Sequence, residues 1–166
     1  MELIAFHTDL KNFEEFHPDS KLWIYSCNRL FSEFETEEIA KKLTLFCSDW
    51  RSHGTPISAS FSIVKNCMIL LSVDAKGESA SGCSIDSSMA VIKELENELK
   101  ISLTNRLSII LEKDNQISFV LFHELLDQIK KKSMKEETKI YNNSIDQLKN
   151  LSQWKQPIYN SWISKL

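Results

Sequence analysis

One segment of this sequence predicts a buried strand, a loop of small residues and the start of a helix in direct succession. Met68 to Asp74 is an almost entirely apolar run, and residues 79–88, which read SASGCSIDSS, are nearly all small. After them, apolar residues recur at helical spacing: Met89, Ile92, Leu95 and Leu99. The chain has only three glycines, and Gly77 and Gly82 lie beside or within this loop. Because glycine allows a close approach of the backbone and a helix N-terminus presents free N–H groups, the loop is a candidate binding site.

Hydrophobic patterning and turn residues predict the other elements of the chain. The expected strands cover residues 22–27, 57–64, 68–73, 107–112 and a segment that starts at Gln116. Lys65-Asn66 is expected to be the turn of a hairpin. Three helices are expected: one that begins with Thr36 as its N-cap, one over 86–100 and one over 122–132. Residues 139–151 are expected to be helical or irregular.

The order of these elements predicts the fold class. Strands and helices are mixed and the strands form hairpins, so we expect a single α+β domain over residues 1–166 with a largely antiparallel sheet. The first six elements match the ferredoxin-like order β-α-β-β-α-β, and a hairpin strand and helices would follow this core.

Composition excludes several classes of function. The 166 residues carry 42% hydrophobic and 26% charged residues and a net charge of −3, so no basic surplus indicates nucleic-acid binding. The sequence has no apolar window of about 18 residues that would predict a membrane span, and it shows no signal peptide. We therefore expect a cytoplasmic protein. The four cysteines lie about twenty residues apart and match no zinc pattern. We therefore expect reduced thiols, no metal and no cofactor.

Several landmarks together resemble a known family. They are the segments 23–29 (WIYSCNR), 50–54 (WRSHG), 82–88 (GCSIDSS) and 141–143 (YNN), with Trp154, Pro157 and Trp162 near the end. This pattern is similar to a family of small proteins of Bacteroidetes-type bacteria that often carry the label "ABC transporter ATPase". The chain has no GxxxxGK[ST] phosphate loop, however, so we expect it not to be an ATPase of that class.

Cys83 is the first candidate for chemistry. A helix N-terminus favours the thiolate form, and a nucleophilic cysteine needs a base, for which His53 is best placed in the sequence. With loop N–H groups stabilising an oxyanion, these residues would suit acyl transfer or hydrolysis. The alternative interpretation is a structural cysteine in a tight loop.

Hydroxyl and basic groups near the loop are candidates for ligand binding. The loop serines could hold a phosphate or carboxylate, or Asp86 or Ser87 could simply cap the helix. Arg29 could bind an anion, or form an ion pair, for example with Asp86. The full candidate set comprises Asn28, Arg29, Gly82, Ser84, Asp86, Ser87 and Ser88.

Two other groups have competing interpretations. Asp74, Glu78 and Asp86 could bind Mg²⁺ or Ca²⁺, but their spacing matches no EF-hand loop. The C-terminal aromatic residues, among them Trp154 and Trp162, either hold the chain end on the core or contact a partner. The leading hypothesis is a small-molecule or anion site at Gly82–Ser88; the alternative is a non-enzymatic interaction or structural module that binds a protein partner or forms a homo-oligomer.

Overall fold

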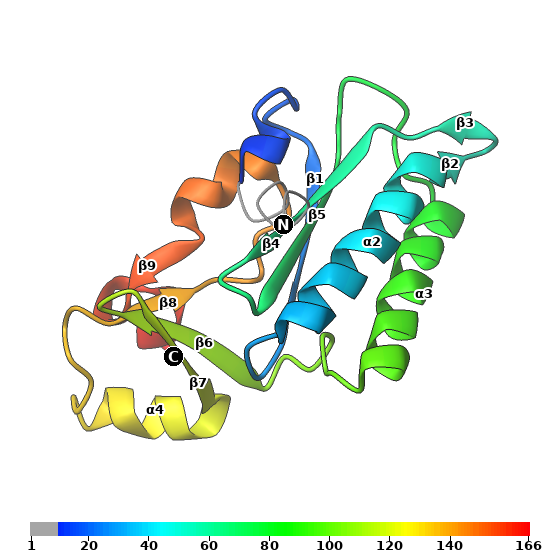
Figure 1. The fold of residues 1–166 in the computed structure, drawn as a ribbon. Helices are drawn as coiled ribbons and strands as arrows, with labels where there is room; N and C mark the ends of the chain where they lie inside the picture. Colours follow the sequence, from blue (N-terminus) through cyan, green and yellow to red (C-terminus); the bar gives the residue numbers. More distant parts are fainter. Residues whose placement is uncertain (1–9) are drawn as a thin grey trace.

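The computed structural model describes residues 10–166, in which two antiparallel sheets are the main framework (Figure 1). The first sheet contains β1 (Lys21–Ser26), β4 (Ala59–Val64) and β5 (Met68–Val73) in the order β1-β5-β4. β5 is antiparallel to both neighbours. The predicted hairpin is confirmed: Lys65 and Asn66 lie in its turn with positive φ angles of 54° and 51°, and the Cys67 N–H donates to the Val64 carbonyl at 3.2 Å.

β5 is buried along its whole length because both faces of the sheet are covered. Ile69 and Leu71 pack on one face among residues of α2 (Glu33–Asp49) and α3 (Gly82–Leu99). Met68 and Leu70 pack on the other face against the C-terminal part of the chain. Successive residues of a strand point to opposite faces, so a strand covered on both sides requires the continuous apolar run seen in the sequence.

The two long helices begin earlier than the sequence predicts. Ser32, not Thr36, is the N-cap of α2, and it forms a capping box with Glu35. Ser81 is the N-cap of α3 and accepts a hydrogen bond from Ser84 N. Asp86 and Ser87, the expected caps, therefore lie inside the helix.

The second sheet has the order β7-β6-β8-β9. Its strands are β6 (Ser108–Lys113), β7 (Gln116–Leu121), β8 (Lys139–Tyr141) and β9 (Lys155–Pro157), and α4 (Phe122–Lys130) follows β7. The expectation for residues 139–151 is wrong at its start, because Lys139–Tyr141 is a strand. The remaining short elements are η1 (Leu10–Phe13), β2 (Arg51–Ser52), β3 (Thr55–Pro56), η2 (Leu148–Gln153), η3 (Ile158–Asn160) and η4 (Trp162–Lys165).

The α+β class is confirmed, but the ferredoxin-like core is incomplete. β1, α2, β4, β5 and α3 form a split β-α-β unit, with β5 between β1 and β4 as in that fold. The sixth element, β6, does not pair with β1, because β7 occupies one of its edges through a tight turn and β8 occupies the other. β1 is consequently left as an edge strand of the first sheet.

The C-terminal segment joins the two sheets. Leu22 and Met68 of the first sheet share a core cluster with Ile110 of the second sheet and with Tyr141 and Trp154. Beyond them, the ring of Trp162 stacks on Phe122 with an interplanar angle of 4°. The C-terminal aromatic residues thus hold the chain end on the core, as one of the two interpretations predicted. The apolar spacing within residues 1–20 predicts a short helix or an arm packed on the core. Phe13 of this segment is buried, and Leu3, Ile4 and Phe6 lie outside the described residues.

Candidate functional site

The loop and helix start at residues 79–88 satisfy most of their own hydroxyl groups. Three serine side chains donate to carbonyl groups of the same segment: Ser84 to Ser81 at 2.9 Å, Ser87 to Cys83 at 3.0 Å and Ser88 to Ile85 at 2.7 Å. The Ser81 hydroxyl caps the helix. A hydroxyl whose proton is already donated to a carbonyl has none left for an anion. Helix chemistry therefore accounts for most of the serines that the sequence groups together.

The structure brings the neighbourhoods of Cys83 and His53 near each other without joining the two side chains. The Trp50 indole N–H donates to the Ser84 carbonyl at 3.0 Å, which ties the end of α2 to the start of α3. His53 lies in the exposed turn between β2 and β3 with a φ of 49°, and Cys83 is exposed. Within residues 10–166, no hydrogen bond links these side chains to each other. Their catalytic pairing stays a prediction.

Arg29 is held by a residue other than the one considered from the sequence. Its guanidinium forms two hydrogen bonds to the carboxylate of Glu35, at 2.6 and 2.8 Å, and not to Asp86. This pairing lowers the pKa of Glu35 from 4.5 to about 2, although burial opposes the shift. Neighbouring Asn28 is exposed and accepts only a weak contact from the thiol of Cys27. The structure thus contains an ion pair at Arg29, with Glu35 as its partner, and anion binding by Arg29 stays a prediction.

Gly82 and the loop acids also have ordinary surroundings. A Cβ atom added to Gly82 would meet nothing within 4 Å, so a close backbone approach does not require glycine there. The buried carboxylate of Asp74 accepts hydrogen bonds from the backbone of His17 and Lys76 and from the Ser20 hydroxyl. In the part of the chain that the structure describes, no group of three His, Cys, Asp or Glu residues is arranged to hold a metal.

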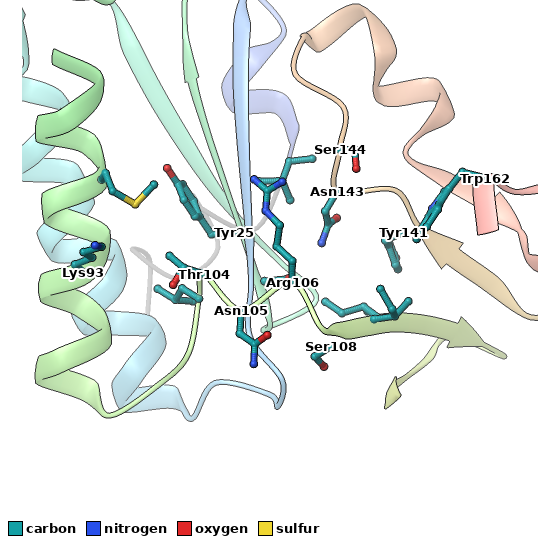
Figure 2. A pocket seen from close by; sticks show the side chains of 16 residues that line it. Tyr25, Lys93, Thr104, Asn105, Arg106, Ser108, Tyr141, Asn143, Ser144 and Trp162 are labelled. Carbon is teal, nitrogen blue, oxygen red and sulfur yellow. The ribbon is translucent and has the colours of Figure 1, made fainter. Parts of the chain in front are cut away.

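A cavity of about 450 Å³ lies elsewhere, between the two sheets (Figure 2). The edge of β1 and the side of α3 form one wall, the segment 103–106 and the start of β6 form the floor, and the C-terminal segment forms the other wall. The lining residues are Ile24, Tyr25, Ser26, Met89, Lys93, Leu103, Thr104, Asn105, Arg106, Ser108, Ile109, Ile110, Tyr141, Asn143, Ser144 and Trp162. The cavity occupies the side of β1 at which a ferredoxin-like fold would place its last strand.

The charge of this lining is one-sided. Among the described residues that line the cavity, Lys93 and Arg106 are the only charged ones, and both are basic. Arg106 forms no hydrogen bond or ion pair with any residue in the range 10–166, and Figure 2 shows its side chain extending along β1. Burial raises the pKa of Tyr25, the aromatic residue across from it, and the Arg106 charge partly opposes that rise.

The wall formed by Tyr141 is fixed by a buried carboxylate. The Tyr141 hydroxyl donates to Glu112, which also accepts a 2.8 Å hydrogen bond from Lys155. Burial, followed by the Glu112 carboxylate, raises the pKa of Tyr141 above its ordinary value. Beside it, Asn143 accepts a 2.9 Å hydrogen bond from the Trp154 indole, which leaves its amide N–H groups as donors. Two of the polar lining residues are thus held in place from behind.

Sequence reasoning missed this cavity because its residues form no motif. Tyr25, Lys93, Arg106 and Asn143 are separated by long stretches of chain. Tyr25 and Asn143 fall within segments that carry the family resemblance, but no local pattern relates the four residues to one another. A further local signal is that Asn105-Arg106 falls between an expected helix and an expected strand, where loops commonly carry binding residues.

Comparison of the chain with protein-family models, with curated proteins and with solved structures finds no match. The family resemblance noted from the sequence therefore stays a prediction, as does the absence of ATP hydrolysis. No helix within residues 10–166 has the length and apolar character needed to cross a membrane.

Proposed function

We propose that this protein binds a small anionic ligand with an apolar part in the cavity between its two sheets. The observation that carries the proposal is Arg106, which lines the cavity without a partner in the described chain while no acidic residue lines it. A guanidinium presents a planar set of donors that matches a carboxylate or a phosphate. An unpaired guanidinium in a concave site without counter-charge attracts such a group.

The remaining lining suits the rest of the ligand. Ligand sites commonly measure about 300–1,000 Å³ and combine apolar walls with a few fixed polar groups. Here Met89 and Leu103 supply apolar surface, whereas Asn143 and Ser108 supply hydrogen-bonding groups. Lys93 adds positive charge, although it also attracts the carboxylate of nearby Glu96. We therefore assign the anionic group to Arg106 and the apolar part to the α3 side.

Thiol chemistry is not part of this proposal. The cavity lining includes neither a cysteine nor a histidine among its described residues, so a bound ligand would meet no nucleophile of that kind. Anion binding at Gly82–Ser88 and Cys83-dependent acyl transfer are separate hypotheses. The loop offers weaker support for anion binding than Arg106 does in the cavity, because its hydroxyls already donate to helix carbonyls.

The test measures ligand binding through the changes that each probe causes in the heteronuclear NMR spectrum. The probes are benzoate, hexanoate and phenyl phosphate, with benzamide as the uncharged match of benzoate. We expect the charged probes to shift the amide signals of Tyr25 and Asn143, and the Arg106→Gln variant to weaken binding at least about tenfold, as loss of a charge-assisted hydrogen bond implies.

Arg51→Gln is the matched control, because Arg51 is exposed on β2 and, among the described residues, its guanidinium donates only to the Gly54 carbonyl at 3.2 Å. It removes the same charge without touching the cavity and should bind like the wild type. If no charged probe shifts the cavity signals, or if both variants weaken binding equally, the proposed function is wrong.

A further inference from the structure

Within the described residues, one edge of β1 has no strand partner over most of its length. β5 covers one edge of this strand, and the C-terminal segment reaches only the beginning of the other edge. There, the N–H of Leu22 donates to the Asp146 carbonyl at 2.8 Å, and the N–H of Leu148 donates to the Ser20 carbonyl at 3.1 Å. Beyond Leu22, the neighbouring chain leaves the strand and the cavity begins.

The backbone groups that face the cavity follow from the alternation of an antiparallel strand. Because every second residue directs its N–H and C=O to the same edge, Ile24 and Ser26 point the same way as Leu22. Both residues line the cavity. Their outward N–H and C=O groups have no hydrogen-bond partner in the described chain. Unpaired edge groups of this kind are a template for another strand.

We propose that the ligand of the cavity is an extended peptide, which adds to β1 at Ile24–Ser26 and places its C-terminal carboxylate on Arg106. This inference rests on the proposed function and names the chemical class of its ligand. The source of the peptide is the C-terminal segment of a partner polypeptide. Strand addition of this type takes affinity from main-chain hydrogen bonds and specificity from pockets for alternate side chains.

Two features favour a peptide over another carboxylate, and a third explains where its carboxylate would lie. The edge of β1 offers both N–H and C=O groups at strand spacing, and a peptide backbone presents the complementary groups at the same spacing. Successive side chains of an added strand would face opposite sides of the first sheet. On one side they would meet Met89 and Leu103, and on the other side Ile110 and Tyr141. The unpaired charge of Arg106, which lies beside β1 in Figure 2, matches the charge that every free C-terminus carries.

The experiment uses two random pools of N-acetylated tetrapeptides, one with free C-terminal carboxylates and one with C-terminal amides. Each pool is equilibrated with the full chain, and bound peptides are identified by mass spectrometry. We expect enrichment from the carboxylate pool and at least about tenfold weaker binding of the matching amides. Arg106→Gln should remove the preference for the carboxylate, whereas Arg51→Gln should retain it.

Strand addition is then tested on the most enriched peptide with a single N-methyl group placed at each residue in turn. An added strand directs alternate N–H groups to β1, so methylation should weaken binding about tenfold at alternate positions and little at those between. Equal effects at all positions, or shifts of NMR signals outside the cavity, would overturn the inference. If the small carboxylates bind at Arg106 but no peptide is enriched, the inference fails and the proposed function stands; if nothing binds at Arg106, both fail.

Discussion

The start of α3 and the cavity between the sheets differ in how their polar groups are used. At Gly82–Ser88, several hydroxyl-bearing residues are adjacent in sequence, and most of their protons go to helix carbonyls. In the cavity, the polar residues are scattered along the chain, yet Arg106 and the outward edge of Ile24 and Ser26 lack partners in the described structure.

The difference shows why a cluster of polar residues in sequence is weak evidence of a site. Serine side chains readily bond to nearby backbone groups, so a serine-rich helix start satisfies itself. Polar groups that have no hydrogen-bond partner in the folded protein remain available, and a bound ligand can supply the partner.

Glu112→Ala should destabilise the wall of the cavity most. The change leaves the Tyr141 hydroxyl and the Lys155 ammonium without their buried acceptor, so we expect the free energy of unfolding to fall by about 3 kcal/mol. Urea unfolding followed by circular dichroism measures the change. Glu136→Ala, at an exposed acid, is the control and should stay within about 0.5 kcal/mol of the wild type. Equal losses in both variants would show that this carboxylate does not hold the wall.

Cys83 should react with iodoacetamide at least about tenfold faster than Cys67 at neutral pH. Cys83 is exposed, whereas burial raises the pKa of Cys67 to about 12. Site-resolved mass spectrometry gives both rates. Exposure alone explains this contrast, so the nucleophile hypothesis needs a stronger result: Cys83 must react faster in the folded protein than in urea, and His53→Ala must slow it. If neither occurs, Cys83 is an ordinary surface thiol.

Glu35→Gln should lower the free energy of unfolding at neutral pH by about 2 kcal/mol. This value is smaller than the pKa shift alone implies, because Arg29 is half-exposed and solvent screens the ion pair. Because the pKa of Glu35 is about 2 in the folded protein and 4.5 ordinarily, the unfolded chain binds more protons between these values. The stabilisation is therefore complete above about pH 4.5 and is lost as the pH falls towards 2. Unfolding measured across this range should show a flatter dependence in the variant. An unchanged slope would mean that the ion pair does not form in solution.

Gly82→Val should have the smallest effect, because the added side chain begins in open space. We expect phosphate to raise the melting temperature equally in this variant and in the wild type, and less in Arg106→Gln. Phosphate also stabilises proteins by general exclusion, so only the differences between variants carry meaning. The opposite ranking, with the response lost in Gly82→Val and kept in Arg106→Gln, would restore the loop as the anion site.

Local signals predicted the elements of this fold well. The strand at 68–73 follows from its apolar run, and the turn at Lys65-Asn66 follows from the short polar break between two strands. The helix boundaries were less accurate, since Ser32 and Thr36 both have the hydroxyl that a cap needs. Which of them caps α2 was decided by the Glu35 side chain, which completes a capping box with Ser32 and also holds Arg29.

The sequence by itself determined the α+β class, the hairpins and the buried strand at 68–73, because periodicity and turn chemistry act over a few neighbouring residues. Only the tertiary structure decided that β6 pairs with β7 and β8, which leaves β1 with an open edge. The cavity, the unpaired Arg106 and the outward groups of Ile24 all follow from that choice of strand partners. Pairing between distant strands depends on which of all the available strand edges bind each other most favourably. A local sequence pattern does not predict that result.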